Sequence, residues 1–168
     1  DDMLDLAQIE SGRLVTRSET VSLNDTLESC LASISGLAEE KNVTLHYDEG
    51  QEDILLRADT VRFRQVLLNL LSNAVKYNRP SGRVDISSEI KGAGCRIYVR
   101  DTGSGFNSAD QEKLFEPFVR LGWENSDTQG TGIGLAICKR LVVAMKGNID
   151  CTSVPGEGDL PMKEIFAA

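Results

Sequence analysis

The chain has 168 residues, of which 40% are hydrophobic, and its formal net charge is -8. This length and apolar content suit one domain with a core of its own. The acidic surplus argues against nonspecific binding to nucleic acid or to an anionic membrane surface, and we expect no nucleic-acid partner.

Cysteine usage and hydropathy narrow the class of protein further. The four cysteines are far apart and form no C-x-x-C pair, which argues against zinc or redox chemistry. We expect them to be small buried hydrophobes in a reducing compartment. No apolar run has the length of a bilayer span, and no signal peptide is visible. The four are Cys30, Cys95, Cys138 and Cys151.

The first segment, Asp1–Gly12, has Met3, Leu6, Ala7 and Ile9 on one helical stripe. The stripe begins in mid-helix without an initiating methionine, so we expect the chain to be a piece of a longer protein. This segment is too short to fold alone.

The next elements follow from capping and periodicity. Ser22 with Asp25 resembles a capping box, and Asp59 can cap a second helix over Thr60–Tyr77. The alternating runs Val43–Tyr47 and Ile54–Arg57 predict two short strands. The first helix is expected to bury Leu27, Leu31, Ile34 and Leu37, and the second Phe63, Val66, Leu67, Leu70, Leu71 and Ala74.

The second half of the chain mixes strands and helices without strict alternation. A hairpin through Lys91–Gly94 is predicted to join two strands, and a short helix and a polar glycine-bounded loop come before a longer helix. This pattern predicts an α+β fold, a mixed sheet with helices on one face. The predicted strands are Val84–Ile90, Cys95–Arg100 and Asn148–Ser153, the helices Asp110–Phe118 and Ile133–Met145, and the loop Trp123–Gly130.

A second, polar stripe runs along the predicted Thr60–Tyr77 helix. It includes Asn69, Asn73 and Lys76, after Arg62 and Gln65. Asn is a poor helix former, so two of them one turn apart suggest a role. An amide oxygen is a hard ligand suited to magnesium. A solvated helix face remains the alternative for this stripe by itself.

Two glycine turns could bring the backbone close to a ligand. Asp101 follows a predicted strand directly and opens D-T-G-S-G, where a carboxylate could accept a hydrogen bond from an exocyclic amine. The run G-T-G-I-G-L at Gly130–Leu135 opens a helix, whose first N–H groups can bind phosphate. Each turn alone is weak evidence, and F-E-P-F at Phe115–Phe118 alone suggests core packing.

Four motifs follow one another in the chain: N-L-L-S-N-A-V-K-Y at Asn69–Tyr77, D-T-G-S-G at Asp101–Gly105, F-E-P-F at Phe115–Phe118 and G-T-G-I-G-L at Gly130–Leu135. Together and in this order, they resemble the catalytic ATP-binding domain of sensor histidine kinases, which has the Bergerat (HATPase) fold. The resemblance covers roughly Val21 to Gly158, and the opening D-L-A-Q-I-E-S-G resembles the end of the dimerisation-bundle helix. It implies a two-layer α/β sandwich with a mainly antiparallel sheet. It also implies a bundle end and linker at residues 1–20 and a catalytic domain at residues 21–168.

The resemblance assigns a role to each motif. Asn73 would be the principal Mg²⁺ ligand with Asn69 assisting, Lys76 would contact phosphate, and Tyr77 would pack against the nucleotide. Asp101 would read the adenine amino group, within a turn that includes Gly103 and Gly105. The phosphate turn would comprise Gly130, Thr131, Gly132, Ile133, Gly134 and Leu135. Phe115 and Phe118 would flank a mobile lid at Trp123–Gly130, and Arg120 could reach phosphate.

The implied activity is transfer of the ATP γ-phosphoryl group to a histidine on a dimerisation domain outside this chain, with ATP and Mg²⁺ as cofactors. The implied partners are that domain, in a parent homodimer, and a response regulator receiver domain, in the cytoplasm. The single histidine, His46, lies in a strand pattern and has no acidic neighbour of the acceptor motif. We therefore expect no autophosphorylation of this fragment.

Two alternatives stay open at this point. The domain could be a degenerate nucleotide-binding regulatory module without phosphotransfer. It could also be another ATPase of the same fold, although those use a catalytic Glu on the Asn-bearing helix and none lies between Thr60 and Tyr77. The tail also departs from the family, because Pro161 cannot donate to a ladder. Either the last strand is short and at an edge, or the tail lies elsewhere.

Overall fold

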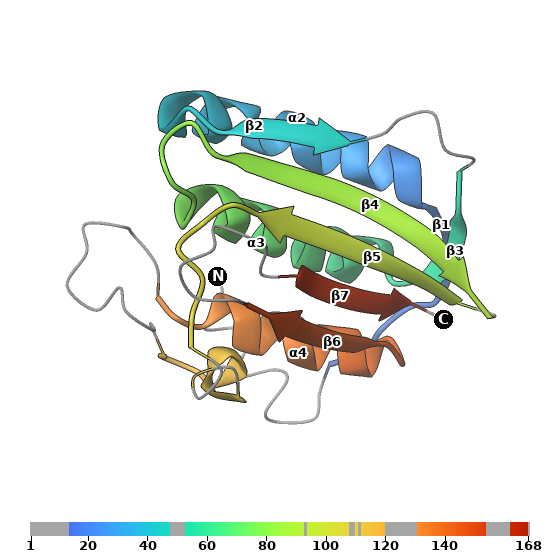
Figure 1. Cartoon of the computed structure of the whole chain (residues 1–168). Helices are drawn as coiled ribbons and strands as arrows, with labels where there is room; N and C mark the ends of the chain where they lie inside the picture. Colours follow the sequence, from blue (N-terminus) through green and yellow to red (C-terminus); the bar gives the residue numbers. More distant parts are fainter. Residues whose placement is uncertain are drawn as a thin grey trace.

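The computed structural model describes residues 14–47, 53–92, 94–107, 110, 112–119 and 131–153, and the backbone of 162–167. A five-stranded sheet forms one layer, and the helices α2, α3 and α4 cover one of its faces (Figure 1). The helices are α2 Leu23–Lys41, α3 Thr60–Lys76 and α4 Gly134–Ala144, with a short 3-10 helix, η2, at Glu112–Phe115. The strands are β1 Glu19–Ser22, β2 Thr44–Tyr47, β3 Leu55–Ala58, β4 Arg83–Lys91, β5 Gly94–Asp101, β6 Asn148–Thr152 and β7 Met162–Ala167.

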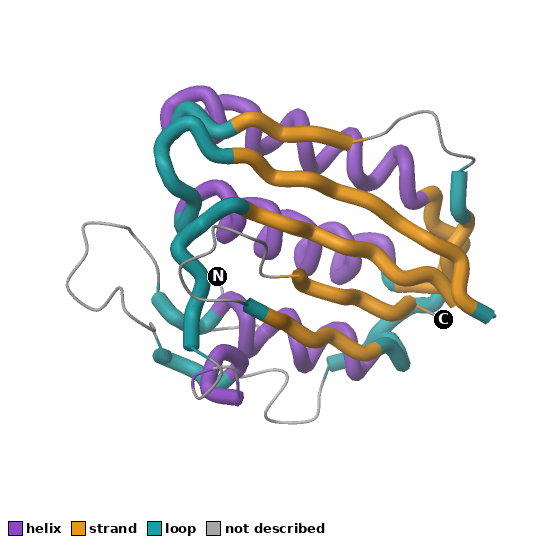
Figure 2. The backbone as a smooth tube through the Cα atoms, in the orientation of Figure 1, coloured by secondary structure: helices purple, strands orange, loops and turns teal. Residues whose placement is uncertain are grey.

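The large sheet has the order β2-β4-β5-β7-β6, and β1 and β3 form a separate antiparallel pair. Strand β2 runs parallel to β4, and every other pairing in the large sheet is antiparallel. Figure 2 shows the helices lying together behind the strands. The predicted two-layer α+β architecture with a mixed, mainly antiparallel sheet is therefore confirmed.

Local signals place the first two long helices. Ser22 caps α2, because its Oγ accepts the N–H of Asp25 at 3.0 Å. Asp59 caps α3 in the same way, through the N–H of Arg62 at 3.0 Å. All six residues of the apolar stripe predicted for α3 are buried. In α2, Leu27 and Ile34 are buried as expected, whereas Leu31 and Leu37 are only partly buried at the edge of the core.

The core lies between the sheet and the three helices. Ile97 and Val99 of β5 are completely buried, as are Leu67 and Leu70 of α3 and Leu141 of α4. Helix α3 packs against both α2 and α4 and touches β4 and β5, so it lies in the middle of the helical layer. Its polar stripe is consequently held at a fixed position relative to the end of β5 and the start of α4.

The position of the tail differs from both alternatives that the sequence left open. Strand β7 lies inside the sheet, antiparallel to β5 on one side and to β6 on the other. The strand begins at Met162, the residue after Pro161, so its ladder does not need a proline N–H. Strand β1 was not predicted, because its four residues have too little alternation to be recognised without their partner β3.

Among the described residues, no helix combines the length and the apolar character that crossing a membrane would require.

Candidate functional site

The polar stripe of α3 carries two neighbouring amides. Asn69 and Asn73 are one turn apart and half-buried, and Asn73 Nδ2 donates to Asn69 Oδ1 at 3.3 Å. Lys76, also half-buried, ends the helix on the same stripe, and Tyr77 forms its C-cap. In the part of the chain that the structure describes, no three His, Cys, Asp or Glu residues form a metal cluster. The oxygens that Asn69 and Asn73 offer to a metal are amide carbonyls, which are hard ligands.

Helix α4 begins against this face. A Cβ atom placed on Gly134 would lie 2.5 Å from Asn69 Oδ1 and 2.7 Å from Asn69 Nδ2. The residue before it, Ile133, is 1% exposed and anchors the turn in the core. An Ile side chain cannot cap a helix, and no side-chain cap bond is made at this start. The positive end of α4 therefore lies beside the two amides, which is the chemistry of a site for an anion with a bound cation.

The segment of Phe115 and Phe118 is joined to the turn before α4. The N–H of Phe118 donates to the carbonyl of Gly132 at 2.9 Å. Gly132 has a φ of +70°, and a Cβ there would come within 3.0 Å of the Phe118 backbone. Only glycine fits both the left-handed φ and the close approach. The hydrogen bond and this close approach join the predicted phosphate turn and the F-E-P-F segment into one structural unit.

The two phenylalanines of that segment have different environments. Phe115 packs against the edge of the core, and Lys139 Nζ of α4 lies 5.1 Å from its ring centroid. Phe118 is 64% exposed and has a left-handed φ of +67°. The core-packing interpretation of the motif therefore holds for Phe115 and is wrong for Phe118.

Asp101 ends β5 and is 4% exposed. Its Oδ1 accepts the N–H of Gly103 at 2.9 Å, which closes a tight turn at the strand end. A Cβ on Gly103 would lie 2.5 Å from the carbonyl oxygen of Tyr77 and 2.8 Å from Asp101 Oδ1. The turn therefore brings the buried carboxylate close to Tyr77, the C-cap of α3, and Gly105 continues the turn with a φ of +67°.

Sequence reasoning missed two residues at this junction. Asn78, directly after the end of α3, and Thr102, directly after Asp101, are hydrogen-bonded to each other at 3.0 Å. The only signal available in the sequence was the position of each residue beside a motif residue.

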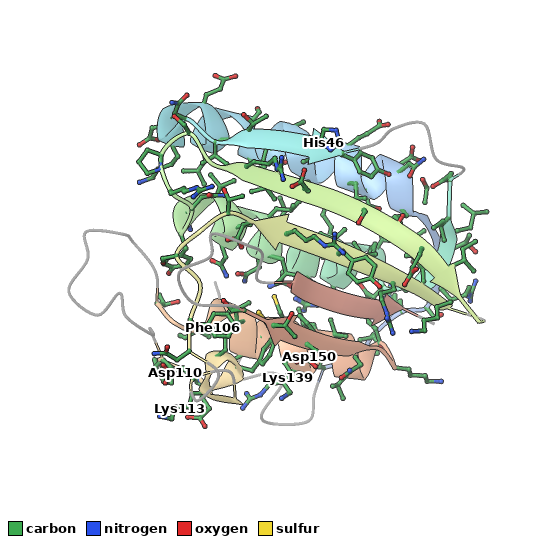
Figure 3. The ribbon with its side chains drawn as sticks, in the orientation of Figure 1. His46, Phe106, Asp110, Lys113, Lys139 and Asp150 are labelled. Atoms are coloured by element: carbon green, nitrogen blue, oxygen red, sulfur yellow. The ribbon has the colours of Figure 1, made fainter. Side chains whose placement is uncertain are left out.

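His46 and the cysteines lie outside this site. Figure 3 shows His46 on β2, at the opposite edge of the sheet from Lys139 and Asp150. Its side chain is 68% exposed, with Nδ1 3.7 Å from Asp85 Oδ1. All four cysteines are buried, as predicted, and burial raises the pKa of the Cys30 and Cys95 thiols to about 11. Those two thiols are protonated at neutral pH and are inert in ordinary chemistry.

A cavity of about 250 Å³ lies at the other end of α4, lined by residues that include Arg17, Arg57, Asp59 and Lys146. The 11 residues of α4 separate it from Gly134 by roughly 15 Å, at about 1.5 Å per residue. It is therefore distinct from the contact of Gly134 with Asn69. Several predicted features lie outside the described residues: Arg120, Gly130, the lid Trp123–Gly130 and the opening segment Asp1–Gly12.

Known proteins resemble this chain in sequence and in fold. The family described as histidine kinase-, DNA gyrase B-, and HSP90-like ATPase matches residues 58–160. Sensor protein GacS of Pseudomonas syringae pv. syringae is 38% identical over 168 residues, covering 94% of this chain and 18% of GacS. The chain thus spans about a fifth of the length of the curated relatives that it matches.

Two solved structures extend the match to three dimensions. Full-length ShkA, solved in complex with AMPPNP, is 29% identical with a TM-score of 0.82, over 99% of this chain and 34% of that one. The catalytic domain of histidine kinase ThkA is 27% identical with a TM-score of 0.76, over 90% of this chain and 95% of that one. Because the family model covers more than half of the residues, the chain belongs to the histidine kinase-, DNA gyrase B- and HSP90-like ATPase family.

Proposed function

We propose that this chain is the ATP-binding catalytic domain of a sensor histidine kinase. It would donate the γ-phosphoryl group of ATP to a histidine on a dimerisation domain outside the chain. One observation carries the proposal: the start of α4 lies directly against the amide face of α3, with Gly134 touching Asn69. A phosphate-binding helix start and the amide oxygens that suit magnesium thus lie at one point.

The proposed metal-binding and phosphate-binding residues lie at this contact between α4 and α3 or on the same face of α3. Asn73 would hold Mg²⁺ through its side-chain oxygen, since its nitrogen is directed at Asn69. Asn69 would assist, and Lys76 would balance phosphate charge from the end of the same stripe. When bound, Mg²⁺ supplies charge neutralisation at the phosphates, which together with positioning does most of the work in phosphoryl transfer. The donor set fits that ion, because Mg²⁺ takes few protein oxygens and keeps water and phosphate ligands.

The base would be read by Asp101. Its carboxylate is buried at the end of β5 beside Tyr77, whose ring could pack against the nucleotide. Adenine presents an amine to this acceptor, whereas guanine presents a carbonyl at the same position. A buried carboxylate facing a carbonyl would lose a charge-assisted hydrogen bond of about 1.5–3 kcal/mol. The site would therefore prefer ATP to GTP.

Two further groups complete the proposed site. The turn Gly130–Leu135 would cradle the phosphates, and Trp123–Gly130 would be the lid that closes over them. Arg120 would add a charge near the phosphates. Phe115 and Phe118 would flank the lid, which is consistent with the hydrogen bond between Phe118 and Gly132.

The parent protein would supply the remaining parts. Residues 1–20 would be the end of a dimerisation-bundle helix and a linker, leading into the catalytic domain at 21–168. The partners would be that bundle, in a cytoplasmic homodimer, and the receiver domain of a response regulator. The length of the curated relatives, about five times that of this chain, is consistent with such additional domains.

Isothermal calorimetry with Mg–ATP and Mg–GTP tests the nucleotide assignment. We expect a clear preference for ATP, and Asp101→Asn should lower ATP affinity by roughly ten-fold or more. Equal affinity of the unaltered chain for both nucleotides would contradict the role of Asp101.

Phosphotransfer is tested with γ-labelled ATP. The isolated chain should not become labelled, because its single imidazole lies on β2, at the sheet edge farthest from β6 and α4. Addition of the dimerisation bundle of the parent protein should produce label on the bundle. Label on the isolated chain that disappears in His46→Ala would contradict the proposal. A bundle that stays unlabelled in the presence of bound ATP would instead support a regulatory module.

A further inference from the structure

The junction between α3, β4 and β5 is held by one side-chain amide. Asn78 Nδ2 donates to the carbonyl of Ala74 at 3.1 Å and to the carbonyl of Arg83 at 3.0 Å. Its Oδ1 accepts the hydroxyl of Thr102 and the N–H of Arg79, each at 3.0 Å. An Asn amide has two donors and two acceptor positions, so all four are used. The side chain can therefore take only this orientation without losing bonds.

Thr102 continues the connection into the turn of Asp101. Its hydroxyl accepts the N–H of Arg83 at 2.9 Å while it donates to Asn78. Its own N–H donates to the carbonyl of Arg83 at 3.1 Å. With 7% exposure, Thr102 has little access to water that could replace these bonds. Asn78 and Thr102 together are called the Asn–Thr bridge below.

The loop before β4 packs tightly around the bridge. A Cβ on Gly82 would collide with Asn78 Oδ1 and would come within 2.8 Å of Thr102 Oγ1. Gly82 is buried, and its N–H donates to the carbonyl of Arg79 at 3.0 Å. The loop between α3 and β4 therefore closes around the bridge, and only a glycine fits at its centre.

We propose that Asn78 and Thr102 are positioning residues that set the Asp101 carboxylate for recognition of the adenine amine. This inference rests on the proposed function, since it concerns the same nucleotide site. Asp101 and Thr102 are adjacent, and Gly103 is confined between Tyr77 and Asp101. The bridge thus determines how far the end of β5 lies from the end of α3. The turn that follows fixes the Asp101 carboxylate through the N–H of Gly103, so the bridge sets the position of that carboxylate relative to the end of α3.

The experiment compares ATP with purine riboside triphosphate, which lacks the 6-amino group. Calorimetry with Mg²⁺ gives the ratio of the two dissociation constants. In the unaltered chain we expect ATP to bind at least ten-fold more tightly, and Asp101→Asn should remove most of that preference. Thr102→Val keeps the shape of the side chain but removes the hydroxyl, and should lower the preference to about two-fold. Thr102→Ser retains the hydroxyl and should therefore keep most of the preference for ATP.

Thr26→Val is the matched control. Thr26 is also a buried threonine, 8% exposed, whose hydroxyl donates at 2.7 Å to the carbonyl of Ser22 at the start of α2. The Thr26→Val variant should have a lower melting temperature, but its ratio of the dissociation constants for ATP and purine riboside triphosphate should be unchanged. Asn78→Ala provides a second test of the bridge if Thr102→Val does not fold. Because Asn78 is only half-buried, this change is expected to be tolerated and should reduce the ratio as Thr102→Val does.

The outcomes separate this inference from the proposed function. No preference for ATP in the unaltered chain would contradict the assignment of Asp101, and the inference with it. A preference that Asp101→Asn removes but that Thr102→Val and Asn78→Ala leave at its full value would overturn the inference alone. A reduced ratio in both bridge variants, with the ratio of Thr26→Val unchanged, supports it.

Discussion

Gly134 and Asn69 are 65 positions apart in the sequence and in direct contact in the fold. A Cβ at Gly134 would lie 2.5 Å from Asn69 Oδ1, 2.7 Å from Nδ2 and 3.0 Å from Cγ. All three atoms belong to one side-chain amide, so the start of α4 faces Asn69 with no space for a methyl group. Glycine at 134 therefore leaves the Asn69 amide in its place, and no left-handed φ at 134 adds a further need for glycine.

Gly134→Ala should weaken nucleotide binding with little loss of stability. The added methyl group would push the Asn69 amide aside, and a side chain can rotate at small cost. We expect ATP affinity to fall by roughly ten-fold, the value of about one hydrogen bond, with a change in unfolding free energy of about 1 kcal/mol or less. Calorimetry and thermal denaturation measure the two effects. Unchanged ATP affinity would show that the Asn69 amide does not contribute.

Gly103→Ala should instead destabilise the fold. Its added methyl group would meet the backbone carbonyl of Tyr77 at 2.5 Å, which cannot rotate away. Overpacking of this kind costs about 1–3 kcal/mol. Gly36→Ala is the control, because it lies within α2 with no atom within 4 Å of an added Cβ. That change should stabilise the protein by about 0.5–1 kcal/mol. Equal melting temperatures for the two variants would be incompatible with this packing.

Asn73→Ala should abolish the magnesium dependence of nucleotide binding and leave the fold intact. Asn73 is half-buried and lies off the apolar stripe of α3, so its truncation opens no core cavity. ATP affinity would be measured with Mg²⁺ and with EDTA, alongside a melting curve. Gln65→Ala is the control, two turns earlier on the same polar stripe and about 12 Å away. A normal response to Mg²⁺ in a folded Asn73→Ala chain would exclude Asn73 as the ligand.

Because of the Asp59 cap, the free energy of unfolding should decrease at acidic pH. Burial alone would raise the pKa of this carboxyl, but the backbone N–H groups of Arg17, Val61 and Arg62 together lower it below its ordinary value of 3.8. A carboxyl with a lowered pKa in the folded state stabilises the fold fully above its unfolded value. That contribution is lost as the pH falls below about 3.8 and through the folded-state pKa.

Denaturant unfolding of the unaltered chain and Asp59→Asn, between pH 6 and pH 3, tests this dependence. Asn keeps the capping geometry but does not ionise, so the two chains should converge in stability as the pH falls. Asp59→Ala removes the cap and should cost about 1 kcal/mol at pH 6. A constant difference between the first two chains across the range would refute the assignment.

Lys146→Gly should stabilise the end of α4. Lys146 has a left-handed φ of +64°, and the N–H of Gly147 donates to the carbonyl of Val142 at 2.8 Å. This is the helix-ending arrangement in which glycine is usual, since a Cβ is strained there. Relief of that strain should gain about 1 kcal/mol, or about 3 °C in melting temperature for a chain of this size. Lys146→Ala retains the strain and should show no gain.

The caps and buried faces of α2 and α3 could be predicted because their signals are local. Ser22 and Asp59 each accept a backbone N–H three residues ahead, and the stripe from Phe63 to Ala74 follows helical periodicity. The motifs also identified Asn69, Asn73, Asp101 and Gly134 as a group, through their order along the chain. The roles of these residues in binding remain predictions.

Contacts between distant segments were decided only by the tertiary structure. Strand β7 lies inside the sheet because β5 and β6 offer it partners on both sides, and nothing in its own six residues encodes that place. The Asn–Thr bridge and the contact of Gly134 with Asn69 depend in the same way on how α3 packs between β5 and α4. Periodicity and capping report interactions within about four residues, whereas these contacts span 24 and 65 positions and arise only when the layers close around a common core.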